Sequence, residues 1–165
     1  MMDLLAYLEQ SGFSVWVRES RSLLAFPGIL LLHTYGMALV VGIVFAIDLR
    51  ILGFAPALPL APIGTFLPLL WAAFWVNAVT GTILLVADAT NKMANADFYV
   101  KMGFIALAVI NQRMIENRVF RGQPIDKTVF SIRLKTLAVT SLVCWIGAIT
   151  AGRLLAYTGP MAGLK

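Results

Sequence analysis

Charged side chains are scarce in this chain of 165 residues. Lys, Arg, Asp and Glu make up 13% of it and hydrophobic residues 60%, whereas about a quarter of an average soluble domain is charged. The apolar residues also come in long runs, and about 20 such residues cross the roughly 30 Å of a bilayer's hydrocarbon as a helix. The composition therefore excludes an ordinary water-soluble domain and predicts an integral membrane protein in contact with the lipid bilayer.

Cysteine and histidine each occur once. Cys144 has no partner for an intramolecular disulfide, and its place in an apolar run predicts a small core residue. The chain also lacks a phosphate-binding loop, a zinc-ligand spacing, a catalytic triad and paired carboxylates within its apolar runs. Hydrolase and nucleotide-driven activities therefore have no support.

Basic residues exceed acidic ones, and the net charge is +5. Six of the thirteen Lys and Arg residues lie between Arg113 and Lys135. In a membrane protein such a basic loop indicates topology, so we expect no nucleic-acid partner.

Four apolar segments predict an all-α integral membrane protein, a four-helix bundle in one domain of residues 1–165. A short segment behind Asp3, with Trp16 and two arginines, predicts an N-terminal helix at the membrane interface. The expected elements are the interfacial segment 3–24 and the spans 27–48, 65–87, 98–113 and 136–157.

Four spans place both termini on one side of the membrane and the basic loop on the other. Because basic loops favour the cytoplasm, we expect the bacterial inner membrane with a periplasmic N-terminus, although Lys and Arg divide only seven against six between the two sides.

The only histidine, His33, falls inside the first span. It follows Pro27 by six residues, or about 9 Å along a helix, and Gly81 precedes Asp88 by seven, so the two have about the same depth. Gly147 lies somewhat deeper on the fourth span. A histidine facing glycines on neighbouring helices is expected to leave a flat apolar slot for a planar ligand.

His33 shares a helical face with Gly36 and Met37. Histidine is the common axial ligand of haem iron, and the cations Lys101 and Arg153, near the same membrane face, could each pair with a haem propionate. This pattern predicts haem b as the cofactor and His33 as the metal ligand. The alternative is a histidine that only hydrogen-bonds a neighbouring helix, beside cations that snorkel to the surface.

One histidine cannot supply both axial ligands of haem within one chain. The second position would be filled by Met37 or Met102, stay open, or receive His33 of a symmetry-related subunit, which makes a homo-oligomer expected. An open position favours ligand chemistry, and two histidines favour electron transfer.

Other polar and aromatic residues predict structural contacts. Asp48 is expected to pair with Arg113 or Arg133 as a tie between helix ends. Interhelical hydrogen bonds are expected at Asn77, Thr80 and Thr82, an interfacial belt at Trp71 and Trp75, and a core position, able to stack beside a bound ring, at Trp145.

Several motifs, taken together, resemble a bacterial family of small membrane proteins of unknown function. They are His33-Thr-Tyr-Gly-Met-Ala-Leu-Val-Val-Gly, Asp48-Leu-Arg-Ile-Leu-Gly, Thr80-Gly-Thr-Ile-Leu-Leu-Val-Ala-Asp-Ala and Phe98-Tyr-Val-Lys-Met-Gly-Phe-Ile-Ala-Leu-Ala-Val-Ile-Asn111.

A first-span histidine joined to a third-span Lys-Met-Gly-Phe-Ile-Ala-Leu is also distantly similar to the copper-resistance-D family and to membrane-bound, haem-associated protoporphyrinogen oxidases. The resemblance implies a role in haem binding for His33 and Lys101. The further histidines usual in those families have no counterpart here.

The leading hypothesis is a b-type haem protein for electron transfer or redox chemistry, with a quinone or another redox protein as partner. One alternative is a transporter of copper or a small solute, supported by Met37 and Met102. Another is a cofactor-free accessory or scaffold subunit.

Overall fold

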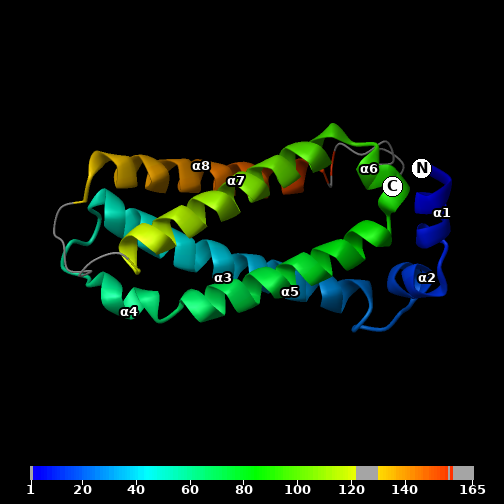
Figure 1. The fold of residues 1–165 in the computed structure, drawn as a ribbon. Helices are drawn as coiled ribbons and strands as arrows, with labels where there is room; N and C mark the ends of the chain where they lie inside the picture. Colours follow the sequence, from blue (N-terminus) through cyan, green and yellow to red (C-terminus); the bar gives the residue numbers. More distant parts are fainter. Residues whose placement is uncertain (1, 122–129, 156, 158–165) are drawn as a thin grey trace.

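Long helices dominate the computed structural model, which describes residues 2–121, 130–155 and 157 (Figure 1). Over these residues the chain is all-helical, and four helical runs are long and apolar enough to cross a membrane. They are α3 (Phe26–Leu52), the run Leu60–Val86 formed by α4 (Leu60–Gly64) and α5 (Leu67–Val86), α7 (Ala96–Val119) and α8 (Ile132–Leu154). The predicted all-α bundle with four membrane-spanning helices is confirmed.

The long helices begin where the sequence supplies local start signals. Pro27 stands in the first turn of α3, where its missing N–H costs nothing. The side chains of Asn95 and Ser131 cap α7 and α8 by accepting from backbone N–H groups. The third span continues six residues past its predicted end, because Ile115 and Val119 extend its buried face. Part of the basic loop, residues 122–129, lies outside the described residues.

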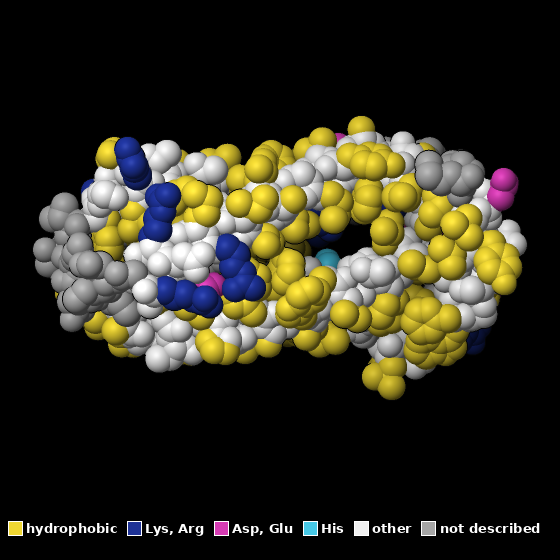
Figure 2. Space-filling model, viewed as in Figure 1, with side chains coloured by type: hydrophobic (Ala, Val, Ile, Leu, Met, Phe, Trp, Pro, Cys, Tyr) yellow, Lys and Arg dark blue, Asp and Glu magenta, His cyan; other side chains and the backbone are white. Residues whose placement is uncertain are grey.

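The bundle is arranged around α3, which packs along both α5 and α8, while α7 packs along α8. Helices α5 and α7 are tied near one end by a hydrogen bond of 3.0 Å from Trp71 Nε1 to Glu116 Oε2, and are joined at the other end through α6 (Ala89–Met93). Between these two ties the helices diverge and leave a hollow in the surface (Figure 2). The bundle is therefore open on its α5–α7 side.

The N-terminal helices α1 (Met2–Glu9) and α2 (Gly12–Glu19) sit across one end of the bundle, beside α6 (Figure 1). Glu9 accepts hydrogen bonds from the amide and hydroxyl of Thr90, at 3.1 and 2.6 Å. Arg18 Nη1 donates to the carbonyl of Ala87 at 2.8 Å. The bond from the Thr90 hydroxyl lowers the pKa of Glu9, and the nearby charges of Arg18 and Lys92 act in the same direction. The first helix, α6 and the end of α8 share one end of the bundle, as predicted.

The outer surface is largely apolar, which suits a protein that faces lipid (Figure 2). Trp75 on α5 is 64% exposed, and its place in an interfacial belt stays a prediction. Trp71, predicted to belong to the same belt, instead packs against the core of the bundle. The Arg113 guanidinium lies over its ring, 3.6 Å from the ring centroid. Thr82, predicted to bond a neighbouring helix, donates to Ala78 on its own helix, so that prediction is wrong.

Candidate functional site

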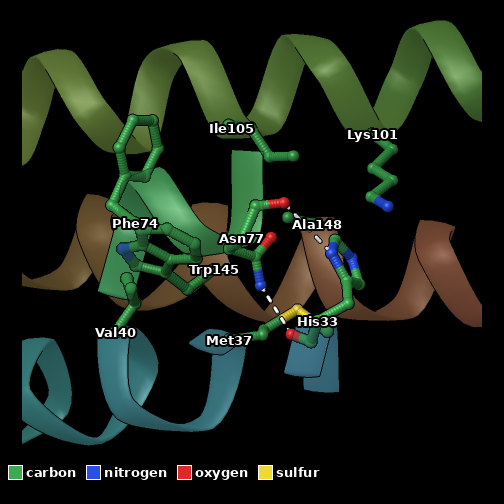
Figure 3. A pocket seen from close by; sticks show the side chains of 9 residues that line it. All are labelled: His33, Met37, Val40, Phe74, Asn77, Lys101, Ile105, Trp145 and Ala148. Carbon is green, nitrogen blue, oxygen red and sulfur yellow. Dashed lines mark hydrogen bonds between the residues drawn. The ribbon is translucent and has the colours of Figure 1, made fainter. Parts of the chain in front are cut away.

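A pocket lies behind the hollow between α5 and α7. Its lining residues come from all four long helices (Figure 3). They are His33, Met37 and Val40 from α3, Phe74 and Asn77 from α5, Lys101 and Ile105 from α7, and Trp145 and Ala148 from α8. The enclosed part of the pocket measures only about 30 Å³, roughly the share of one water molecule, so a larger ligand would have to extend into the hollow.

His33 is buried and held through one ring nitrogen. Its Nδ1 lies 3.1 Å from the backbone carbonyl of Asn77 and 3.1 Å from the hydroxyl oxygen of Thr80. The carbonyl can only accept, and the Thr80 hydroxyl already donates to the carbonyl of Val76 at 2.7 Å, so Nδ1 carries the proton. The lone pair is then on Nε2, which has no hydrogen-bond partner among the described residues.

Asn77 completes the attachment of His33 to α5. Its side-chain amide donates to the backbone carbonyl of His33 at 2.8 Å, so the two residues bond each other in both directions. Gly36 allows this close approach, because a Cβ there would lie 3.2 Å from the carbonyl oxygen of Ala73. The interhelical bonds predicted for Asn77 and Thr80 are confirmed, and they orient the histidine.

Gly81 makes room for the imidazole itself. A Cβ on Gly81 would meet His33 Cε1 at 3.0 Å, so the predicted common depth of the two residues is confirmed. Gly147 has a different neighbour, since a Cβ there would lie 2.8–2.9 Å from the ring of Phe104. The expected flat slot between glycines is therefore wrong: the bundle's own side chains and backbone already fill the space that the glycines leave.

Lys101 reaches from α7 toward His33 across the pocket (Figure 3). Its aliphatic chain passes over Gly152, where a Cβ would lie 3.5 Å from Cε. Among the described residues Lys101 has no ion pair or hydrogen bond, and no acidic side chain lines the pocket. An unpaired cation in a membrane-spanning segment marks a functional site, and it favours an occupant with negative charge.

The neighbouring cation, Lys92 on α6, is already satisfied. It forms an ion pair with Asp88 at 3.8 Å and donates to the carbonyl of Leu84. Burial lowers the pKa of Lys92, and the charges of Asp88 and Glu9 partly offset this effect. Lys101 is therefore the cation left without a counter-ion at the pocket.

The remaining predicted site residues divide between the pocket and its surroundings. Met37 lines the pocket one turn after His33. Arg153 is exposed on the last turn of α8 and Met102 is 46% exposed, and neither lines the pocket. The structure thus brings His33, Met37 and Lys101 together, with Gly36 and Gly81 supporting the histidine, and leaves Arg153 outside.

Asp48 does not pair as predicted. Arg113 stacks on Trp71 and lies 3.4 Å from Glu116, Arg133 is exposed, and Asp48 has no ion pair within the described part of the chain. Arg113 does not pair with Asp48 because it stacks on Trp71 of α5 and pairs with Glu116 on its own helix.

Phe74, Ile105 and Ala148 are lining residues that the sequence did not single out. Ile105 follows Lys101 by four residues and Phe74 precedes Asn77 by three, so both spacings place them on the faces of residues already under consideration. Which faces meet at one pocket depends on how four helices pack, and the sequence alone does not give that.

Comparison with known proteins adds no family. A scan against protein-family models, a search of curated proteins and a search of solved structures each returned no match to this chain. The chemistry of the pocket therefore carries the functional argument. A histidine with a fixed tautomer offers a free lone pair, a lone cation stands nearby, and the walls are apolar and aromatic.

Proposed function

We propose that the chain is a membrane-embedded b-type haem protein in which His33 Nε2 is the axial ligand. The supporting observation is the fixed tautomer: Nδ1 donates to the Asn77 carbonyl and leaves Nε2 free beside the pocket. Histidines that bind metals almost always donate their other ring N–H to a carbonyl or carboxylate, which sets the ring orientation. The bilayer is the bacterial inner membrane in this proposal, with the α6 end periplasmic.

The polarity of the pocket supports one orientation for the cofactor. Lys101 stands toward the α6 end, while Val40 and Phe74 line the deeper part. Val40 follows His33 by seven residues, or about 10 Å of helix. Lys101 would pair with a propionate near the membrane face, and the apolar residues would surround the ring. Arg153, outside the pocket, has no part in this proposal.

The pocket supplies a single axial ligand. Met37 lies one turn from His33 on the same helix, so both side chains approach from α3 and cannot bind iron from opposite sides. No other histidine or methionine lines the pocket. The donor set thus favours an open coordination position over the paired histidines of electron-transfer cytochromes.

Haem bound there would supply one-electron redox chemistry and a site for a small ligand. The residues of the chain would orient the ring and exclude water. The hollow between α5 and α7 is rimmed largely by hydrophobic side chains (Figure 2), which suits exchange of electrons with a lipid-soluble partner such as a quinone.

An optical spectrum of the protein, purified after expression with ample haem, tests the proposal. We expect a Soret band that is lost in His33→Ala and kept in Tyr35→Ala. Tyr35 lies on the same helix and is 62% exposed, which makes it a matched control. A folded protein without a Soret band, or an unchanged spectrum in His33→Ala, would reject haem binding at this residue.

The propionate assignment has its own test. Lys101→Met should release haem to an excess of a haem-scavenging protein roughly 10- to 150-fold faster, since one charge-assisted bond contributes roughly 1.5–3 kcal/mol. Arg153→Met is the matched control and should release haem at the parent rate. Equal rates in both variants would remove Lys101 from the site and leave the His33 assignment standing.

A copper site is the second candidate, because a thioether and an imidazole line the same pocket at a spacing of four residues. Soft sulfur donors and imidazole suit Cu(I). Metal analysis that finds copper without haem, lost in Met37→Leu and in His33→Ala, would favour it. A folded protein with neither haem nor metal would instead favour an accessory subunit.

A further inference from the structure

A second group of polar side chains is buried in the half of the bundle away from the His33 pocket. Asp48 follows His33 by 15 residues on α3, or about 22 Å along the helix. The group lies between the two apolar clusters of the core, one containing Val44 and Ala108 and the other Ile47 and Ile115. Its members, with their exposed fractions, are Asp48 (0%), Asn111 (5%), Gln112 (1%) and Ser141 (0%).

These four residues come from three helices, with Asp48 on α3, Asn111 and Gln112 on α7, and Ser141 on α8. Asp48 on α3 lies close to Ser141 on α8. Asn111 on α7 donates through its amide to the Leu137 carbonyl on α8 at 2.6 Å, one turn before Ser141. Gln112 lies between Ala108 and Ile115, which belong to core clusters that also contain α3 residues, so its spacings of four and three residues place it on the buried face of α7.

Most polar atoms of this group lack a hydrogen bond. Both carboxylate oxygens of Asp48, the amide oxygens of Asn111 and Gln112, the Gln112 amide nitrogen and the Ser141 hydroxyl are buried without a partner. Ser141 stands beside Asp48 without the geometry of a formed hydrogen bond. Buried polar atoms are nearly always satisfied, and a cluster of exceptions points to a bound water or ion.

The carboxyl group of Asp48 also has no cationic partner among the described residues, and would be unfavourable there in its ionised form. Arg50, on the same helix, donates through Nε to the Leu58 carbonyl and lies over the Phe130 ring, 5.8 Å from its centroid. On α7, Arg113 and Glu116 pair with each other at 3.4 Å. The basic residues at the start of α8 are not buried. A buried charge without a partner is strongly unfavourable.

We propose that Asp48, Asn111, Gln112 and Ser141 bind one alkali-metal cation, with Na⁺ as its probe. All available ligand atoms are oxygens, which suit hard cations. One carboxylate balances one positive charge, whereas a divalent ion would leave an excess charge in a low-dielectric interior. The site is independent of the His33 pocket and of any cofactor there.

Calorimetric titration of the full chain in detergent tests the proposal. The protein is prepared without sodium, and NaCl is compared with choline chloride at constant ionic strength. We expect a saturable heat for Na⁺ and a melting temperature that rises with the logarithm of its concentration. Choline should produce neither effect.

Variants connect the binding to the site. Asp48→Asn, a neutral residue of the same shape, should remove both responses while the helical circular dichroism is kept. Ser141→Ala should weaken binding about fivefold, because a lost neutral ligand costs on the order of 1 kcal/mol. Asp3→Asn removes the same charge at an exposed position and should change nothing.

Two results would overturn the proposal. One is a folded parent protein that shows no sodium-specific heat or change in melting temperature. This result would overturn the proposal even if the stability of the protein depended on pH through Asp48. The other is a sodium response in Asp48→Asn equal to that of the parent.

Discussion

Gly81→Ala should displace His33 without changing any atom that could bind a ligand. The added methyl group would stand 3.0 Å from His33 Cε1, whereas carbon atoms pack best at about 3.5–4.0 Å. The ring must therefore move by roughly 0.5–1 Å toward the pocket, which lengthens its 3.1 Å bond to the Asn77 carbonyl. Overpacking of this kind costs about 1–3 kcal/mol.

A matched control separates this clash from helix propensity. Gly42→Ala, on α3, meets nothing within 4 Å and should gain about 0.5–1 kcal/mol from reduced chain entropy. The free energy of unfolding in mixed micelles should then be about 1–3 kcal/mol lower for Gly81→Ala than for Gly42→Ala. The ¹⁵N resonances of His33 should shift only in Gly81→Ala. Equal stabilisation in both variants, with unchanged His33 resonances, would refute the packing of the imidazole on Gly81.

Two further predictions concern contacts that hold helices together. Glu9→Gln should increase amide exchange in α1, since the charged bonds to Thr90 contribute about 1–2 kcal/mol. Because folding lowers the pKa of Glu9 below its ordinary 4.5, this stabilisation is complete above that pH and is lost as pH falls through the lowered pKa. The protection of α1 amides, measured relative to their intrinsic exchange rates, should therefore fall with pH in the parent and stay constant in Glu9→Gln. The same fall in both proteins would contradict the contact. Gly147→Ala should lower the free energy of unfolding by about 1–3 kcal/mol, because the new methyl group meets the Phe104 ring. Adding Phe104→Leu should restore the stability, and Gly103→Ala, which meets nothing within 4 Å, should not destabilise. No rescue by Phe104→Leu would reject the clash.

The sequence predicted the helices well because their signals are local. The apolar runs, Pro27 at the start of α3 and the side-chain cap Asn95 act within one helical turn. Even the common depth of His33 and Gly81 follows from counting residues along two helices and needs no knowledge of side-chain packing. These features therefore lie within reach of the sequence alone.

The sequence did not predict which side chains fill a space or pair across helices. The space beside Gly147 is taken by Phe104, and the space beside Gly81 by His33 itself. Arg113 stacks on Trp71 and leaves Asp48 alone. Each of these outcomes depends on the rotation of one helix against another, which composition and periodicity do not determine.

The central claim is that the Nε2 lone pair of His33 binds haem iron, and the visible spectrum of His33→Gly with and without added imidazole tests it most directly. The parent protein should show a Soret band, His33→Gly should lose it, and imidazole should restore it by entering the space that the side chain leaves. A Soret band that persists in His33→Gly without imidazole, or its absence from the folded parent protein, would contradict the claim.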